Sequence, residues 1–261
     1  MDRRGFLFKS ASLMAGSLFG LNSFSKALAF GEHLNKPFFQ PRIALIIDDI
    51  GYSLSRARQF LELEVPITFS ILPHLANSHE LAMKIHGKGH EIMLHQPMEP
   101  YNPDLDPGPG ALYVGYEAER IVRIMEENIS GVPFAVGVNN HMGSRFTECQ
   151  KEINEVIKVI DKRCLFFVDS LTSSCSMAYK TARKLRVSAA CRNIFLDNIH
   201  DESAILSQLR KLKKHARKYG RAIGIGHPYQ ETARAIDQFL PGFKESGVSL
   251  VHVSRVLDVG C

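Results

Sequence analysis

Short apolar runs alternate with longer amphipathic stretches from about residue 42 onward, and this alternation constrains the fold more than any other feature of the chain. Runs such as IALIIDD at 43–49 and PITFSIL at 66–72 predict buried strands. Further strands are predicted at 90–95, 133–138, 165–169, 187–191, 193–197, 221–227 and 249–257, and helices at 53–64, 77–88, 117–129, 148–161, 176–185, 202–219 and 231–239. Strands that alternate with helices form βα units around a parallel sheet.

The number of βα units separates the two common parallel folds. About seven or eight units in about 230 residues fit a βα barrel better than an open, doubly wound sheet, which is the alternative. No composition break or linker divides the chain, so we expect one α/β domain. The Pro- and Gly-rich connection at 96–116 is long for such a fold, which indicates a functional loop.

The first thirty residues have the features of an export signal. Arg3-Arg4 is followed by an apolar stretch and then by Ala27-Leu28-Ala29, an A-x-A cleavage pattern. The stretch is too short, and too rich in Ser and Gly, for a good membrane span. The arginine pair resembles a twin-arginine signal, so we predict such a signal peptide at 1–29 and a short lead segment at 30–41. An ordinary secretory signal and a retained anchor are the alternatives, and each places the protein outside the cytoplasm, in our expectation in a periplasm.

Charge and motif content exclude several functions. The formal net charge is +5, but residues 1–29 hold four basic residues and one acidic residue, which leaves 28 basic against 26 acidic residues. This balance does not indicate nonspecific nucleic-acid binding. The five cysteines have no CxxC spacing, and P-loop, GxGxxG and GxSxG motifs are absent. Zinc-finger, disulfide-scaffold, nucleotide-binding and serine-esterase functions therefore have no support.

Polar residues follow the apolar runs at corresponding places. They are Asp48, Asp49, His74, His95, His141, Asp169, Asp197 and His227. In a βα barrel these strand ends converge on the face where active sites lie. One such residue is usually a cap, but capping alone does not explain so many. Carboxylates and imidazoles without a sulfur ligand in register suit a divalent metal such as zinc.

The two consecutive acids, Asp48 and Asp49, need not do the same job. Neighbouring strand residues point to opposite sides, so one carboxylate could hold a metal while the other takes a proton from its water. The alternative is that Asp49 caps the turn before Gly51.

The next two motifs each supply a candidate metal-ligating histidine. His95 heads HQPMEP, where Glu99 follows four residues later and is either functional or a solvated loop acid. His141 lies in a tight polar turn with Asn140 and Ser144, which can line a sugar or peptide pocket. A hydrogen-bonded turn histidine is the alternative for His141.

The remaining candidates come from later strands, apart from His74, which is a candidate pocket wall. His227 ends IGIGH and is a candidate general acid for a leaving group. Asp169 could orient a catalytic histidine or bind a substrate hydroxyl, but a helix cap is equally compatible with its neighbours. Asp197 carries a weaker signal of the same kind.

Six motifs occur in the order IIDDIG, MLHQPMEP, GVNNHMGS, FFVDSLTSS, FLDN and IGIGHPYQET. Together they resemble the divergent polysaccharide deacetylases, distant relatives of the NodB-homology, carbohydrate esterase family 4 enzymes. The resemblance runs from Arg42 to the C-terminus. It implies a distorted (β/α)7 barrel in a single domain at 42–261 and a divalent metal, commonly zinc.

The resemblance also implies roles for single residues. Asp48 would be the base and Asp49 a metal ligand. The superfamily's second motif is His-x-x-x-His, but this chain has Glu99 at the second place. Either Glu99 ligates or His141 completes the site with His95, and we favour His141 because it keeps an Asp/His/His set.

The same resemblance assigns the late histidine, which protonates the departing amine, to His227, with Asp169 as its partner. The superfamily's middle-motif arginine has no clear match, since Arg145 lies near but fits poorly. Glu99, Asn140, Ser144 and His74 are predicted to line the substrate site.

These assignments predict a metal-dependent deacetylase of N-acetylated amino sugars in an envelope polysaccharide. The expected partner is an acetylated cell-envelope glycan, with no nucleic acid and no stable membrane span after signal cleavage. The alternative is a non-catalytic periplasmic glycan-binding or scaffold protein that retains the barrel.

Overall fold

The computed structural model describes residues 40–244 and 246–257. The predicted signal peptide, and residues 30–39 of the lead segment, lie outside the described residues. The described residues form one compact unit, in agreement with a single α/β domain.

A nine-stranded sheet organises this unit, and all its strand pairs are parallel. The order is β6-β5-β4-β3-β2-β1-β8-β7, with β9 also paired to β1. The strands are β1 (Arg42–Ile50), β2 (Thr68–Ile71), β3 (Glu91–Met98), β4 (Ala135–Met142), β5 (Phe166–Asp169), β6 (Ala189–Cys191), β7 (Ile194–Phe195), β8 (Arg221–Gly226) and β9 (Ser249–Val251).

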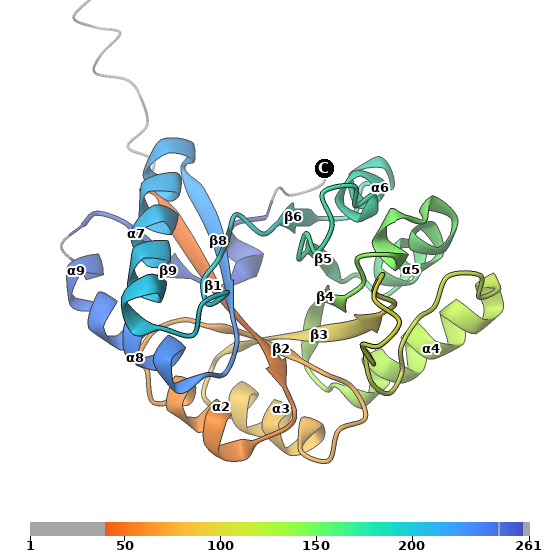
Figure 1. Cartoon of the computed structure of the whole chain (residues 1–261), viewed down its shortest axis with the longest axis horizontal. Coiled ribbons are helices and arrows are strands. Elements are labelled where there is room, and N and C mark those ends of the chain that lie inside the picture. Colours follow the sequence, from red (N-terminus) through yellow and green to blue (C-terminus); the bar gives the residue numbers. More distant parts are fainter. Residues whose placement is uncertain (1–39, 245, 258–261) are drawn as a thin grey trace, which may run out of the picture. The chain divides into compact units, whose positions relative to one another are not determined.

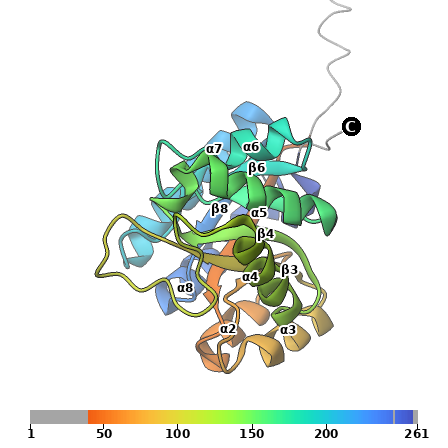
Figure 2. The ribbon, with the colours of Figure 1, turned by 90° about the vertical axis from the view of Figure 1, so that its right-hand side faces the viewer.

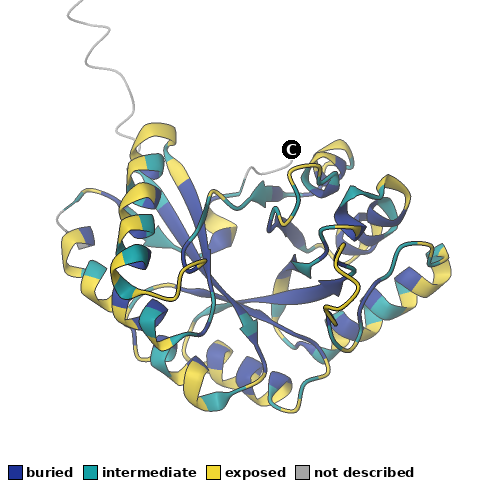
Figure 3. Cartoon of the chain, in the orientation of Figure 1, coloured by how far each residue is buried: buried dark blue, intermediate teal, exposed yellow. Residues whose placement is uncertain are grey.

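Helices follow the strands around the outside of the sheet (Figure 1), with their exposed faces turned outward (Figure 3). They are α2 (Leu54–Leu61), α3 (Ser78–Gly87), α4 (Ala118–Gly131), α5 (Gln150–Lys162), α6 (Ala178–Lys184), α7 (Glu202–Tyr219), α8 (Gln230–Phe239) and α9 (Pro241–Lys244), with 3-10 turns η1 (Phe146–Glu148) and η2 (Val253–Arg255). Within the described ranges the terminal strands β6 and β7 do not pair with each other, so the sheet is a half-barrel of the NodB-like type. The expected barrel class is confirmed.

Two apolar clusters lie on the two faces of the sheet. Ile43, Leu45 and Ile47 of β1 belong to the larger cluster, which includes the buried faces of the helices. Ala44 and Ile46 belong to a smaller cluster inside the curve of the sheet. This strict alternation follows from the two-residue period of a strand. Because both faces are covered, β1 is apolar along most of its length.

The C-terminal segment closes the inner cluster on the side of the strand starts. The strand predicted at 249–257 is wrong beyond Val251, because the chain turns into η2. The amide of Val253 donates to Thr68 Oγ1 at 3.1 Å. Val253 and Val256 are both buried in the inner cluster. Their spacing of three places them on one side of a 3-10 turn, whereas a strand would separate them.

The helix predicted at 202–219 is confirmed with both of its ends. Asp201 caps it by accepting a hydrogen bond from the amide of Ala204 at 2.9 Å. Gly220 ends it in the left-handed conformation, with φ of 82°.

The long connection between β3 and α4 stands out from the body of the domain (Figure 2). Gln96 and Asn128 both donate to the carbonyl of Gly110, at 3.0 and 2.8 Å, and so tie the loop to β3 and α4. Gly110 has φ of 75°, and a Cβ there would collide with the Asn128 side chain. Only glycine fits this crossing point.

Candidate metal centre and active site

Polar residues at the carboxyl ends of the strands continue the apolar rows of the inner cluster. On β1 the row passes from Ile46 to Asp48, and on β8 it passes from Ile225 to His227 just after the strand. His95 follows the same rule on β3. The residues that fill the half-barrel are therefore apolar near its floor and ionisable at its open end.

Asp49 does not follow this rule, and its backbone explains why. A strand would send Asp49 to the opposite face from Asp48, but Asp49 has φ of 57° and lies where the β1–β2 register shifts. Such a bulge re-aims a side chain. The two consecutive carboxylates therefore meet at one site, and the expectation that they point to opposite sides is wrong here.

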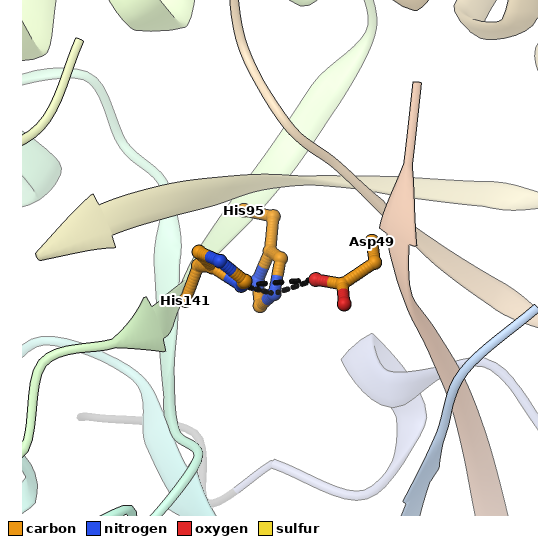
Figure 4. Close-up of side chains that lie close together, drawn as sticks. All are labelled: Asp49, His95 and His141. Atoms are coloured by element: carbon orange, nitrogen blue, oxygen red, sulfur yellow. Dashed lines mark hydrogen bonds and ion pairs between the residues drawn. The ribbon is translucent and has the colours of Figure 1, made fainter. Parts of the chain in front are cut away.

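Asp49, His95 and His141 converge from the ends of β1, β3 and β4 (Figure 4). Asp49 Oδ1 lies 3.1 Å from His95 Nε2 and 2.9 Å from His141 Nδ1. The two imidazole nitrogens lie 3.2 Å from each other. The imidazoles hold the pKa of Asp49 well below its usual range, against the effect of burial, which acts to raise it.

These three ligand atoms fit a divalent ion. Atoms held about 2.0–2.1 Å from a tetrahedral zinc lie about 3.3 Å apart, close to the three separations found. Asp49 Oδ1 is buried without a properly oriented hydrogen bond, although both nitrogens are near. The two imidazole nitrogens are within hydrogen-bond reach of each other, and Asp49 Oδ1 completes a triangle of ligand atoms around a common centre. Asp49 and His141 remain partly exposed, so the centre is open on one side.

Asn139 fixes the form of His95 that can ligate. Asn139 Oδ1 accepts a hydrogen bond from His95 Nδ1 at 2.8 Å, which leaves the Nε2 lone pair facing Asp49. The Asn139 amide nitrogen donates to Asp48 Oδ1 at 2.9 Å. Ser70 also donates to Asn139 Oδ1, so the orientation of the amide is set from both ends.

Asp48 lies beside this centre without being one of its three close ligands. Its Oδ2 is 3.7 Å from His95 Nε2, and the residue is 3% exposed. Burial raises the pKa of the Asp48 carboxyl, and the nearby histidines oppose the rise. A buried carboxylate with a raised pKa is a stronger base than an exposed one.

His227 is held by Asp197, and the predicted pairing with Asp169 is wrong. Asp197 Oδ1 accepts from His227 Nδ1 at 3.0 Å, while Oδ2 accepts from the His227 amide and from Thr232. Burial acts to lower the pKa of His227, but the hydrogen bond and charge of Asp197 outweigh it and raise the pKa to about 9. The free Nε2 faces the centre, 3.8 Å from Asp49 Oδ2.

Asp169 instead organises the connection before α6. Its carboxylate accepts from the Ser176 hydroxyl at 2.7 Å and from the amides of Leu171 and Tyr179 at 2.9 and 3.2 Å. Both oxygens are occupied by this local network, so the capping alternative describes Asp169.

The four residues predicted to line the substrate site hold loops together in this structure. Glu99 accepts from the Val114 amide at 2.7 Å and pairs with Arg145. Ser144 accepts from the amide of Tyr101, Asn140 spans the turn to Ser170 and Met142, and His74 bonds Asn128. Glu99 is not part of the cluster, which favours His141 as the completing residue. Substrate contact by the four stays a prediction.

Three contributors were missed or underrated by the sequence analysis. Asn139 could have been found from the two-residue period, since it precedes His141 by two positions. Asp197 needed the parallel pairing of β7 with β8, which no local pattern shows. Arg192 donates to the carbonyls of Ser170 and Leu171, and its charge acts on Asp48.

Comparison with known proteins identifies relatives along nearly the whole described chain. A sequence model of the divergent polysaccharide deacetylases matches residues 45–257. The protein YibQ of Escherichia coli K12, described as uncharacterized, is 32% identical over 226 residues, which cover 86% of this chain and 70% of YibQ.

Three solved structures show the fold. The uncharacterized protein ATU2773 of Agrobacterium tumefaciens superposes with a TM-score of 0.79 at 26% identity, over 83% of this chain and 89% of that one. A peptidoglycan N-acetylglucosamine deacetylase of Eubacterium rectale gives 0.51 at 10% identity, over 82% and 88%. BA3943 of Bacillus anthracis, a CE4 family pseudoenzyme, gives 0.52 at 15% identity, over 84% and 66%.

Among the described helices, none combines the length and the apolar character needed to span a membrane.

Proposed function

The chain belongs to the divergent polysaccharide deacetylase family, and from that premise we propose that it is a divalent-metal-dependent hydrolase that removes acetyl groups from N-acetylated amino sugars of an envelope polysaccharide. One observation carries the proposal. Asp49, His95 and His141, from three separate strands, place their ligand atoms around one point beside a buried Asp48 and a protonatable His227.

Zinc is the ion we propose for this centre. Two imidazole nitrogens and one carboxylate oxygen are borderline ligands that zinc accepts, and three protein ligands leave a position open. When bound there, a divalent ion lowers the pKa of a water molecule and polarises the acetamide carbonyl.

Asp48 acts as the base. As the water oxygen attacks the carbonyl carbon of the acetamide, Asp48 takes the proton that the water gives up. Asn139 holds Asp48 Oδ1, so Oδ2 is the oxygen that faces the centre. The raised pKa of Asp48 favours this transfer.

His227 acts as the acid. Its pKa of about 9 keeps the imidazole protonated at neutral pH, and Asp197 holds Nδ1 so that Nε2 faces the centre. When the carbon–nitrogen bond breaks, the Nε2 proton passes to the departing amine. Acetate and a free amino sugar are the products.

Exposed side chains around the open end suit a polymer substrate. Tyr52, Tyr101, Leu105 and Ile199 are largely exposed and lie on the connections that follow β1, β3 and β7. Tyrosine rings present apolar faces that can pack on the C–H face of a sugar ring. A single small substrate would not need contacts on several loops.

We also propose that the protein is exported. This part of the proposal rests on Arg3-Arg4 and on Ala27-Leu28-Ala29 in the sequence. Replacement of both arginines by lysine should trap the uncleaved precursor in the cytoplasm. Undisturbed export of that variant would contradict the twin-arginine signal while leaving an ordinary secretory signal in place.

A non-catalytic glycan-binding or scaffold role is the second candidate. The observation in its favour is the pseudoenzyme BA3943, which shares the fold. Acetate release from acetylated oligosaccharides by the metal-loaded protein, measured together with its metal content, separates the two. Acetate release supports the enzyme. Glycan binding by metal-loaded protein without any acetate release supports the scaffold.

A further inference from the structure

A cavity of about 180 Å³ opens next to the candidate metal centre, on the side of β1 and β8. Asp49 and His227 of the candidate site line it, together with Tyr52, Arg56 and Tyr229. Because Asp49 and His227 line it, the cavity borders on the place where the acetamide would be cleaved.

Arg56 supplies a positive charge to this cavity that the described part of the chain does not neutralise. No ion pair or side-chain hydrogen bond joins the Arg56 guanidinium to residues 40–244 or 246–257; its backbone amide donates to Ser53 Oγ at the start of α2. On the same helix, Arg58 pairs with Glu62 at 2.8 Å. The two arginines thus lie two residues apart, but within the described residues only Arg58 has an acidic partner.

The aromatic walls define how a ligand would lie. Tyr229 is held between His200 and His227, with ring centroids 4.1 and 5.7 Å away. Burial raises the pKa of Tyr229, and the charge of Arg56 opposes the rise. Arg56 and Tyr229 both line the cavity. Tyr52 is 62% exposed and leaves a ring face free for a sugar.

We propose that this cavity binds a carboxylate carried by the acetamido-sugar substrate, and that Arg56 is the residue that selects acidic over neutral glycans. The inference rests on the proposed function for the identity of the sugar. A planar guanidinium matches a carboxylate with two parallel hydrogen bonds. One unpaired guanidinium balances one negative charge, which favours a carboxylate over a doubly charged phosphate.

The test compares one oligosaccharide in two forms. An acetamido-sugar oligomer whose rings carry carboxylates is used as the acid and after conversion of its carboxylates to methyl amides. Binding is measured by calorimetry with the zinc-loaded full chain in an Asp48→Asn background, which blocks turnover. Arg56→Gln is the variant and Arg58→Gln the matched control, and both should unfold at nearly the parent temperature.

The acid should bind about tenfold or more tightly than the amide to the parent and to Arg58→Gln, as expected for a charge-assisted pair. Arg56→Gln should bring the ratio close to one, and Arg56→Lys should restore it only partly. Equal binding of acid and amide by the parent, a ratio that survives Arg56→Gln, or no binding of either form would overturn the proposal. A failure of the proposed function shows separately, as no acetate release by zinc-loaded wild-type protein despite an Arg56-dependent ratio.

Discussion

Two acid–imidazole groups lie a few ångströms apart at the open end of the half-barrel, and they differ in how their polar atoms are satisfied. In the Asp197–His227 pair, both carboxylate oxygens accept hydrogen bonds. In the cluster of Asp49, His95 and His141, the shared oxygen Asp49 Oδ1 is buried without one. The first group satisfies its own polar atoms, whereas the second gathers three ligand atoms around one point.

This difference assigns the two groups different work. A buried polar atom without a partner is costly, and a cation held by Asp49 Oδ1 and the two imidazole nitrogens would satisfy it. A satisfied pair instead keeps one nitrogen in a fixed direction, as proton transfer requires. Substitutions within each group test this difference.

The largest effect is expected from removal of a cluster ligand. His95→Ala and His141→Ala should each abolish most metal binding, because two remaining ligands hold a divalent ion poorly. Purified wild-type protein should contain about one ion per chain, measured by elemental analysis. Activity should fall with occupancy.

Glu99→Ala is the matched control. Glu99 follows His95 by four residues, at the second place of the His-x-x-x-His pattern, but it bonds Val114 and Arg145. It should retain the ion. If Glu99→Ala emptied the site and His141→Ala did not, the ligand set described above would be wrong.

The next effect concerns the base. Asp48→Asn should keep the ion, because Asp48 is not one of the three close ligands. It should lower the rate of acetate release by about 10²–10⁴, the usual contribution of a positioned base. Turnover and metal content are measured on the same preparation. Loss of the ion in this variant would mean that Asp48 is itself a metal ligand.

The satisfied pair is tested through Asp197→Asn, which removes the charge but keeps the shape. The ion should stay bound, and turnover of an acetamide should fall by about 10²-fold. An activated aryl acetate needs little protonation of its leaving group, so its hydrolysis should fall less. Equal losses on both substrates would exclude an acid role for His227.

The same variant has a pH signature in metal-free protein. The folded-state pKa of His227, about 9, lies above the ordinary value of 6.5, so the pairing stabilises the fold fully below pH 6.5 and fades as the pH rises through 9. The stability difference between wild type and Asp197→Asn should be about 2–3 kcal/mol at pH 6 and much smaller at pH 10. Urea unfolding at the two pH values measures it.

Local patterns in the sequence predicted the elements and most of the residues that meet at the candidate site. The apolar period placed Asp48 and His95 at the open end of the fold, because a strand's period is rigid over a few residues. It failed at Asp49, where one residue with positive φ reversed a side chain. It also failed for Asp197, because the partner of His227 is decided by which strands lie side by side.

The smallest effect separates two neighbouring asparagines, both buried on β4. Asn139 bonds His95 and Asp48, whereas Asn140 bonds Met142 at the end of β4 and Ser170 and Thr172 just after β5. Asn139→Ala should weaken metal binding by about 10–100-fold, because His95 loses the partner that fixes its tautomer. Asn140→Ala should lower thermal stability with little change in metal affinity. Competition with a chelator of known affinity measures both variants. Equal metal affinities for the two variants would mean that packing alone orients His95. The metal centre would then consist of its three ligands only, with no contribution from Asn139.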